Sequence, residues 1–299
     1  MAGATPIDAQ APIGVFDSGV GGLSVLRHVR AGLSHEDLIY FSDALHAPYG
    51  GRGEAHIEAR ALAIGAFLVA QGVKAIVVAC NTATAVAITA LRSAYPALLV
   101  VGVEPGLKPA AALSRNGVVG VLATEATLAS QKFAGLRDQV AAASGVRFVL
   151  QPCPGLADLI ETGALDSPQL RSMLRTYLAP LVAQRADTIV LGCTHYPFVA
   201  AQIEALLLMH AQDAKSAKHV THVTHATLAH PARDDESAVT MVDTGAAVAR
   251  QLEHVLRQHA AGHGNDHRGR LAGFTNGVPG TLDAAFSGLL GMQVISRQA

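Results

Sequence analysis

Short apolar runs alternate with longer stretches of helical periodicity from Ile13 onward, and two of these runs end in the same way. The first reads KAIVVACNT over residues 74–82, and the second reads ADTIVLGCTH over residues 186–195. In each, a β-branched apolar run and one small residue precede a cysteine, which is Cys80 in the first run and Cys193 in the second. Side chains with hydroxyl groups lie just after each cysteine. Such a run predicts a strand buried on both faces of a parallel sheet. Both cysteines are therefore expected just beyond a strand's carboxyl end, where open α/β sheets bind ligands.

The alternation continues along most of the chain. Strands are predicted near residues 13–16, 37–41, 75–78, 98–103, 117–122, 146–150, 186–191 and 238–242. Helices are predicted near residues 23–31, 54–71, 83–94, 127–142, 156–161, 167–184, 198–209, 245–259 and 279–290. Strands alternating with helices of this length imply right-handed βαβ units. The predicted fold class is α/β, with two similar domains, each a mostly parallel sheet flanked by helices, and an active site in the interdomain cleft.

The predicted domain boundaries follow the breaks in this rhythm. Residues 1–12 are expected to be a disordered tail. The first α/β domain is assigned to residues 13–104 plus 238–299, and the second to residues 105–209. Residues 210–237 form a His-rich insertion with no strand or helix period, containing His219, His222, His225 and His230. A metal-binding tract is one interpretation, but a mobile surface insertion is favoured because no cysteine or carboxylate has a fixed spacing to these rings.

Composition narrows the class of protein. Half of the 299 residues are hydrophobic and 15% are charged, which is typical of a globular protein. A formal net charge of -1 gives no reason to expect nucleic acid or an anionic membrane as partner. No apolar run approaches the roughly 18 residues of a membrane span, and the N-terminus does not resemble a secretory signal. Three cysteines are too few for a disulfide framework, which favours a reducing cytoplasm and free thiols.

Two thiols in matched positions suit acid–base chemistry. A thiol, with an ordinary pKa of about 8.5, can exchange protons near neutral pH when a helix N-terminus or a cation lowers that pKa. If the two domains face each other, one thiol can remove a proton from a carbon centre while the other delivers one to its opposite face, as in a two-base racemase or epimerase. Two alternatives stay open: a binding protein whose thiols are merely buried, and a zinc site of Cys80, Cys193 and His195, although metal-ligand spacing is absent. Cys153, between two prolines, is expected to be a small buried hydrophobe.

Three motifs resemble those of bacterial glutamate racemases. IGVFDSGVGGLSV over residues 13–25 resembles that family's opening signature. ACNTAT over residues 79–84 and GCTHYP over residues 192–197 resemble its two cysteine motifs. The likeness runs from Ile13 to about Leu290, leaving out the tail, the His-rich insertion and the loop near Gly262. Maleate isomerases and aspartate racemases share the two-cysteine architecture, so an aspartate racemase or related two-cysteine isomerase is the alternative.

The resemblance implies a glutamate racemase that uses no pyridoxal phosphate, no other cofactor and no metal. Cys80 would be the base acting on D-glutamate and Cys193 the base acting on L-glutamate. Asp17 and His195 match the residues that assist the thiols, and Asp43 and Glu161 match acidic positions discussed as further helpers. The positions that match the family's substrate-binding residues are Ser18, Pro48, Tyr49, Gly50, Asn81, Thr82, Thr124 and Thr194. The resemblance also implies a homodimer that supplies D-glutamate for peptidoglycan. Composition and charge, not the resemblance, predict a cytoplasmic protein with no nucleic-acid or membrane partner.

Several of these site residues could have a simpler, structural role instead. Serine, threonine and asparagine at strand ends suit carboxylate binding, but they are also preferred helix N-caps, and Asp17 is another candidate cap. For His195, the alternative role is that of a buried core histidine whose ring nitrogens are hydrogen-bonded. Glu161, near the end of a short predicted helix, has the alternative of a solvated surface carboxylate.

Overall fold

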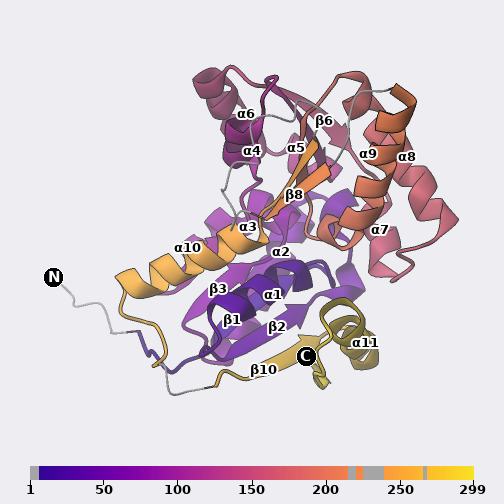
Figure 1. The fold of residues 1–299 in the computed structure, drawn as a ribbon. Coiled ribbons are helices and arrows are strands. Elements are labelled where there is room, and N and C mark those ends of the chain that lie inside the picture. Colours follow the sequence, from indigo (N-terminus) through magenta and orange to yellow (C-terminus); the bar gives the residue numbers. More distant parts are fainter. Residues whose placement is uncertain (1–6, 215–219, 225–238, 265–267) are drawn as a thin grey trace. The chain divides into compact units, whose positions relative to one another are not determined.

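Two parallel β-sheets organise the computed structural model, which describes residues 7–214, 220–224, 239–264 and 268–299 (Figure 1). One compact unit comprises the chain up to Glu104 together with Gly245–Ala299, and the other comprises Pro105–Thr244. Every strand pair in both sheets is parallel. The predicted α/β class, with two domains built on parallel sheets, is confirmed.

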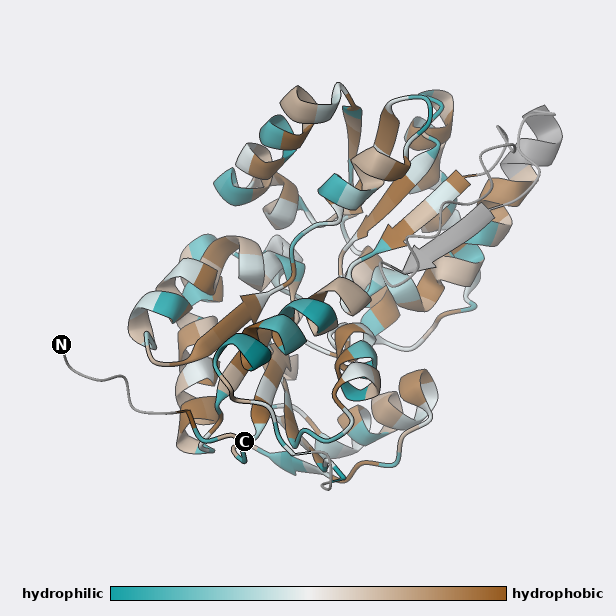
Figure 2. Cartoon of the chain, turned by 60° about the vertical axis from the view of Figure 1, so that its left-hand side comes forward, coloured by the Kyte–Doolittle hydropathy of each residue, from teal (hydrophilic) through white to brown (hydrophobic). Residues whose placement is uncertain are grey.

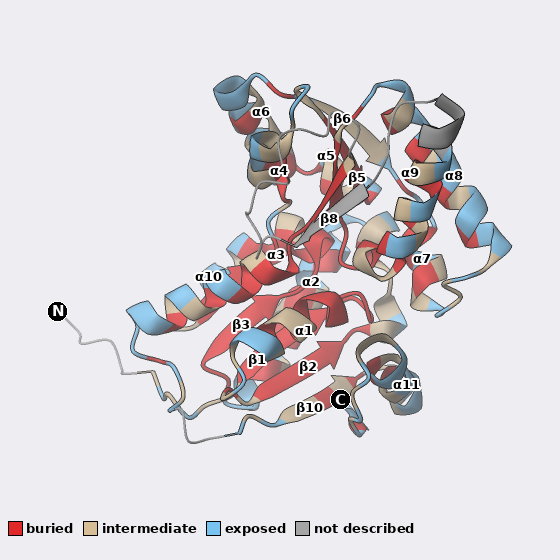
Figure 3. Ribbon diagram, in the orientation of Figure 1, coloured by how far each residue is buried: buried red, intermediate tan, exposed pale blue. Residues whose placement is uncertain are grey.

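The first sheet has the strand order β11-β10-β2-β1-β3-β4. Its strands are β1 (Ile13–Asp17), β2 (Leu38–Ser42), β3 (Ala75–Val78), β4 (Leu99–Gly102), β10 (Leu271–Thr275) and β11 (Ser296–Gln298). The three central strands are buried along their whole length, as Figure 3 shows, because both faces of the sheet are covered. This explains their continuous apolar sequences, which Figure 2 shows in brown.

Five α-helices flank the first sheet: α1 (Leu23–Gly32), α2 (Glu54–Ala70), α3 (Asn81–Ala94), α10 (Gly245–Gln258) and α11 (Pro279–Leu290). Helices α2 and α3 pack together and share an apolar cluster with Phe16, Phe41 and Val78. Alternate side chains face the opposite way: Tyr40 contacts Phe286 of α11 edge to face, with ring centroids 5.7 Å apart. Helix α1 contacts both α10 and α11, so these three helices cover that second face.

The second sheet has the strand order β6-β5-β7-β9-β8. Its strands are β5 (Val118–Ala123), β6 (Arg147–Pro152), β7 (Thr188–Gly192), β8 (Val220–Thr224) and β9 (Val239–Asp243). Its helices are α4 (Leu107–Leu113), α5 (Glu125–Ala129), α6 (Gln131–Ser144), α7 (Leu156–Glu161), α8 (Pro168–Ala183) and α9 (Ala200–Ala214). Ile189 and Leu191 pack with α7, α8 and α9, whereas Val190 packs with α4 and α6. Alternation along β7 thus builds a core on each face of this sheet.

Three expectations about the chain's ends and breaks need correction. The strand near residue 240 does not return to the first domain, because β9 pairs with β7 in the second sheet; the return begins at α10. The expected insertion is not free of strands, since β8 pairs with β9 at the sheet edge, while residues 215–219 and 225–237 lie outside the described residues. Of the expected tail, residues 1–6 lie outside the described part, but Ala9 accepts a hydrogen bond from the ammonium of Lys74 at 2.6 Å.

One predicted helix is interrupted. A continuous helix is expected up to residue 142, but α5 ends at Ala129 and α6 starts at Gln131. The Ser130 hydroxyl accepts a hydrogen bond from the backbone N–H of Phe133 at 3.2 Å, so it caps α6. A serine cap needs extended backbone, which stops the preceding helix. In the part of the chain that is described, no helix combines the length and the apolar character that a membrane crossing requires.

Candidate active site

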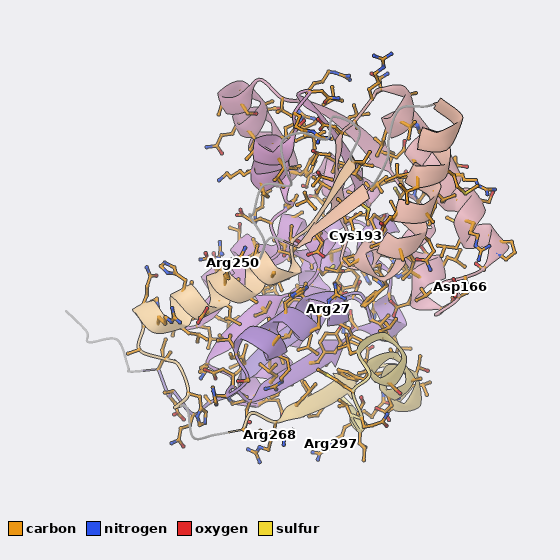
Figure 4. The ribbon with its side chains drawn as sticks, in the orientation of Figure 1. Arg27, Asp166, Cys193, Arg250, Arg268 and Arg297 are labelled. Carbon is orange, nitrogen blue, oxygen red and sulfur yellow. The ribbon has the colours of Figure 1, made fainter. Side chains whose placement is uncertain are left out.

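Both repeated cysteines lie at the carboxyl ends of central strands. Cys80 follows β3 after one residue and is the N-cap of α3, where its sulfur accepts a hydrogen bond from the backbone N–H of Ala83 at 3.5 Å. Cys193 directly follows β7 in the second sheet and is labelled in Figure 4. Both are free thiols, and both are buried. The apolar runs predicted this placement.

Asp17 and Ser18 lie beside Cys80 because β1 and β3 are neighbours in the first sheet. The thiol of Cys80 donates to the Ser18 hydroxyl at 3.9 Å, and that hydroxyl donates to Asp17 Oδ1 at 3.3 Å. Asp17 is fully buried and also accepts from the backbone N–H groups of Ser18, at 2.7 Å, and of Gly22. The carboxylate therefore fixes the turn into α1, as the capping alternative expects, and it is also connected through Ser18 to the thiol.

Asn81 and Thr82 open α3 next to the thiol, and both are buried. Neither the amide nitrogen nor the amide oxygen of Asn81 has a hydrogen-bond partner. A buried polar group without a partner costs about 1–3 kcal/mol. An unpaired donor and acceptor beside a strand-end thiol are therefore suited to a ligand that carries both kinds of group.

Asp43 follows β2, the other neighbour of β1. It is fully buried and accepts a hydrogen bond from the hydroxyl of Tyr49, which belongs to the predicted substrate-binding loop Pro48–Gly50. The guanidinium of Arg60 binds both carboxylate oxygens, with Nε and Nη2 at 3.0 and 2.8 Å. The first unit thus gathers these predicted residues at the carboxyl edge of neighbouring strands.

In the second unit, Cys193, His195 and Glu161 form a linked series. His195 Nδ1 lies 3.7 Å from the sulfur of Cys193, and its Nε2 lies 2.6 Å from Glu161 Oε2. Glu161 is the last residue of α7, and its side chain is 21% exposed. The surface alternative for this carboxylate does not apply, because the histidine holds it.

The electrostatics of His195 reflect these two contacts. Burial opposes protonation, but hydrogen bonds and charge interactions with Cys193 and Glu161 outweigh it, so the pKa of His195 lies well above its usual value. His195 is therefore a different kind of partner from Ser18, which is neutral.

Thr124 and Thr194 lie near the same sheet edge. Ala123 and Gly192 are paired in register, so Thr124 and Cys193 follow adjacent positions of β5 and β7. Thr124 is the N-cap of α5, with its hydroxyl accepting from Thr127 N at 3.2 Å. The capping alternative holds for Thr124. Both threonines are buried.

Two side chains near Asp43 and one near Cys193 were not predicted from the sequence. Arg60 lies on α2, and Asn276 follows β10, where its amide donates to Asp43 at 2.5 Å. Tyr196 is fully buried, and burial together with the neighbouring thiols of Cys193 and Cys153 raises the pKa of its hydroxyl well above the usual value. Asn276, like Asp43, directly follows a strand, so a search for polar residues at the carboxyl ends of strands would also have found it. No periodic signal marks Arg60.

The third cysteine, Cys153, is a neighbour of Tyr196 and interacts electrostatically with Cys193. Cys153 is 2% exposed, and its thiol donates to the carbonyl oxygen of Gln151 at 3.4 Å. Burial raises its pKa to about 12, which leaves almost none of it as thiolate at neutral pH. Within the described ranges, no three histidine, cysteine or acidic side chains come together as a metal-binding group. The histidines at positions 219, 225 and 230 lie outside those ranges.

Comparison with known proteins places this geometry in a family. A sequence model described as Asp/Glu/Hydantoin racemase matches residues 13–252. The chain belongs to this family. A glutamate racemase from Ectopseudomonas mendocina is 49% identical over 251 residues, which cover 84% of each chain. The resemblance read from the three motifs is therefore confirmed.

Solved structures of glutamate racemases share the fold over nearly the whole chain. The enzyme from Francisella tularensis, determined with D-glutamate, has a TM-score of 0.77 and 25% identity, covering 97% of this chain and 98% of its own. The enzyme from Escherichia coli, determined with L-glutamate and the activator UDP-MurNAc-Ala, has a TM-score of 0.73 and 28% identity, covering 96% and 97%. Members of the family thus bind either enantiomer of one amino acid.

Proposed function

We propose that this protein is a glutamate racemase that interconverts L- and D-glutamate by proton transfer to and from two thiols. The observation that carries the proposal is the pair of buried free cysteines at matching strand ends, each with its own polar partners. The 49% identity to a curated glutamate racemase supports glutamate as the substrate. The product D-glutamate would supply peptidoglycan synthesis.

The first half of the reaction is removal of the α-proton. With L-glutamate, the Cys193 thiolate takes this proton, and the electron pair of the broken C–H bond is left on the α-carbon as a carbanion. The adjacent carboxylate delocalises that charge, and fixed neutral donors stabilise it without neutralising the bases. The proposed donors are the buried polar side chains Ser18, Asn81, Thr82, Thr124 and Thr194.

The second half is reprotonation from the opposite face by the Cys80 thiol, which yields D-glutamate. The reverse reaction starts with Cys80 as thiolate and ends with Cys193 as donor. The partners of the two thiols differ: Ser18 and Asp17 connect to Cys80, whereas His195 and Glu161 connect to Cys193. This difference supports the proposal that each thiol acts on its own enantiomer.

The test is proton exchange in heavy water with each glutamate enantiomer. Wild-type protein should racemise both and introduce solvent deuterium at the α-carbon. Cys80→Ser and Cys193→Ser should each lose racemisation by at least about 10³-fold, because a serine hydroxyl does not ionise near neutral pH. Cys153→Ser is the matched control and should keep activity within about 3-fold, since burial raises the pKa of that thiol to about 12 and keeps it protonated at neutral pH.

The outcomes separate the alternatives. Full activity in Cys80→Ser or Cys193→Ser would overturn the two-thiol scheme. Activity on aspartate without activity on glutamate would change the substrate while leaving the scheme intact. A protein that binds glutamate but shows neither exchange nor turnover would be a binding protein with this fold.

We also propose that the protein works as a homodimer, which its resemblance to glutamate racemases supports. Light scattering coupled to size-exclusion chromatography should give twice the 30.8 kDa mass of one chain. A single-chain mass at the concentrations used for activity would contradict this.

A further inference from the structure

We propose that Arg60 and Asn276 are positioning residues, which lock Asp43 as a permanent anchor for the substrate-binding loop Pro48–Gly50. This inference rests on the proposed racemase function. It changes the role of Asp43, which the resemblance assigns to helping proton transfer. It also gives roles to two residues that lie far from Asp43 in the sequence.

The contacts of Asp43 occupy both of its oxygens. Oδ1 accepts from Arg60 Nη2 at 2.8 Å and from the Asn276 amide at 2.5 Å, and His46 Nδ1 lies 3.2 Å from it. Oδ2 accepts from the Tyr49 hydroxyl and from Arg60 Nε at 3.0 Å. A carboxylate has about four lone-pair positions, so this one has no vacant site for a substrate proton.

The contacts tie three elements to the loop. Asp43 follows β2, Arg60 lies on α2, and Asn276 follows β10. Asn276 also accepts from the backbone N–H of Leu45 at 3.1 Å, so its amide holds both Asp43 and the residue two positions after it. The loop itself is held through Tyr49, whose side chain is buried in the cluster shared by α2 and α3.

Tyr49 keeps its proton under all ordinary conditions. Burial and the neighbouring Asp43 carboxylate raise the pKa of the Tyr49 hydroxyl well above its usual value. The hydroxyl therefore stays a donor toward Asp43. An anchor whose two carboxylate oxygens are both occupied sets the position of Pro48–Gly50 and exchanges no proton with the substrate.

The test compares Arg60→Lys, Tyr49→Phe and Asp43→Asn with wild type by kinetics in both directions. Lysine keeps the charge but lacks the fork that binds both oxygens. Each variant should raise KM for glutamate about 5–20-fold and change kcat less than about 3-fold, because the loop contributes equally to binding of substrate and transition state. Arg137→Lys is the matched control: Arg137 also binds one aspartate, Asp138, through Nε and Nη2, but on an exposed surface.

A second measurement does not depend on activity. Amide hydrogen exchange of a peptide covering residues 44–53 should be faster in all three variants than in wild type, and unchanged in Arg137→Lys. This still tests the anchor if wild type fails to racemise glutamate, a result that would overturn only the proposed function. If Arg60→Lys fails to fold, Tyr49→Phe tests the same link, because it removes one hydroxyl and leaves the ring in place.

Two results would overturn the inference. One is a loss of kcat and of deuterium incorporation in Asp43→Asn with KM and amide exchange unchanged, which would make Asp43 a proton-transfer group. The other is unchanged KM and unchanged amide exchange in both Arg60→Lys and Tyr49→Phe, which would mean that the loop needs no anchor.

Discussion

His195 shows how much one side chain's surroundings decide its chemistry. The same ring in water would be mostly neutral at pH 7, because its ordinary pKa is about 6.5. Here Glu161 and Cys193 hold it as an imidazolium despite complete burial. By contrast, burial without a partner cation raises the pKa of Cys153 and keeps that residue a neutral thiol. Burial alone does not make a reactive group; the partner does.

This argument predicts a pH-dependent stability effect for Glu161→Gln. The folded-state pKa of His195 lies above its unfolded value, so its protonation stabilises the fold fully below about pH 6.5, and that contribution is lost as pH rises through the folded pKa. Glu161→Gln should therefore lower the free energy of unfolding by about 2 kcal/mol at pH 6 and by clearly less at pH 10. Urea unfolding at the two pH values measures this.

Glu58→Gln provides the control for that experiment, because Glu58 is exposed on α2 and the substitution is the same. Its effect should stay within about 0.5 kcal/mol at both pH values. An NMR titration should also show the pKa of His195 falling in Glu161→Gln. An equal loss of stability at pH 6 and pH 10, together with an unchanged pKa of His195 in the NMR titration, would show that Glu161 does not hold His195 as an imidazolium.

At the scale of elements, α3 depends on close packing against β4. The Thr84 hydroxyl on α3 donates to Val78 O at 3.1 Å and accepts from Val103 N at 3.0 Å, which ties the helix to the ends of β3 and β4. A Cβ on Gly102 would lie 2.4 Å from Ile88 Cδ1 and 2.6 Å from Thr84 Cγ2. The N-terminus of this helix carries Cys80, so the packing also sets the position of the thiol.

Gly102→Ala should therefore destabilise the protein by about 1–3 kcal/mol, as overpacked core sites do. Gly135→Ala is the matched substitution, since Gly135 lies on the exposed face of α6 with no atom within 4 Å of its added Cβ. It should stabilise by about 0.5–1 kcal/mol, because alanine loses less backbone entropy in a helix. Thermal melts of both variants give the comparison, and a neutral Gly102→Ala would mean that α3 moves freely on the sheet.

The elements also show which parts of the fold a sequence pattern can predict. Buried strands such as β3 and β7 were predictable because burial on both faces demands a continuous apolar run. The break at Ser130 was not, since the residues on either side are all compatible with one helix. Strand β8 carries only a short polar alternation, and its pairing with β9 depends on tertiary contact.

The candidate site likewise contains residues that the sequence could predict and residues that it could not. Residues at or directly after the end of a strand, such as Asp17, Asp43 and Cys193, were predictable from local sequence and parallel topology. The partners that define their chemistry come from distant positions: Asn276 lies 233 residues from Asp43, and Glu161 lies 34 residues from His195. Nothing in the local sequence of either partner records the pairing. Sheet order creates these contacts.

At the scale of the whole molecule, the first unit is assembled from both ends of the chain and the second from one continuous segment. The first sheet needs β10, which pairs with β2, and β11, which pairs with β10. Helix α10 adds an apolar face, with Val248, Leu252 and Leu256 buried, and packs on α1. Both contributions come from the chain after Gly245.

This organisation predicts that residues 105–244 fold alone and residues 1–104 do not. The continuous segment keeps every strand of the second sheet and both of its apolar clusters. The fragment 1–104 leaves β2 as an unpaired apolar edge and uncovers the face of α1 that α10 covers, and such an edge favours aggregation.

The fragment 105–244 should give dispersed amide NMR signals and one cooperative urea transition, whereas 1–104 should be collapsed or aggregated. Joining 1–104 to 245–299 through a flexible Gly/Ser linker should restore cooperative unfolding, because it returns the missing strands and helices to the same sheet. Cooperative unfolding of 1–104 alone would show that the first sheet is stable without β10 and α10. Asn276 would then contact Asp43 from a strand that the fold does not require.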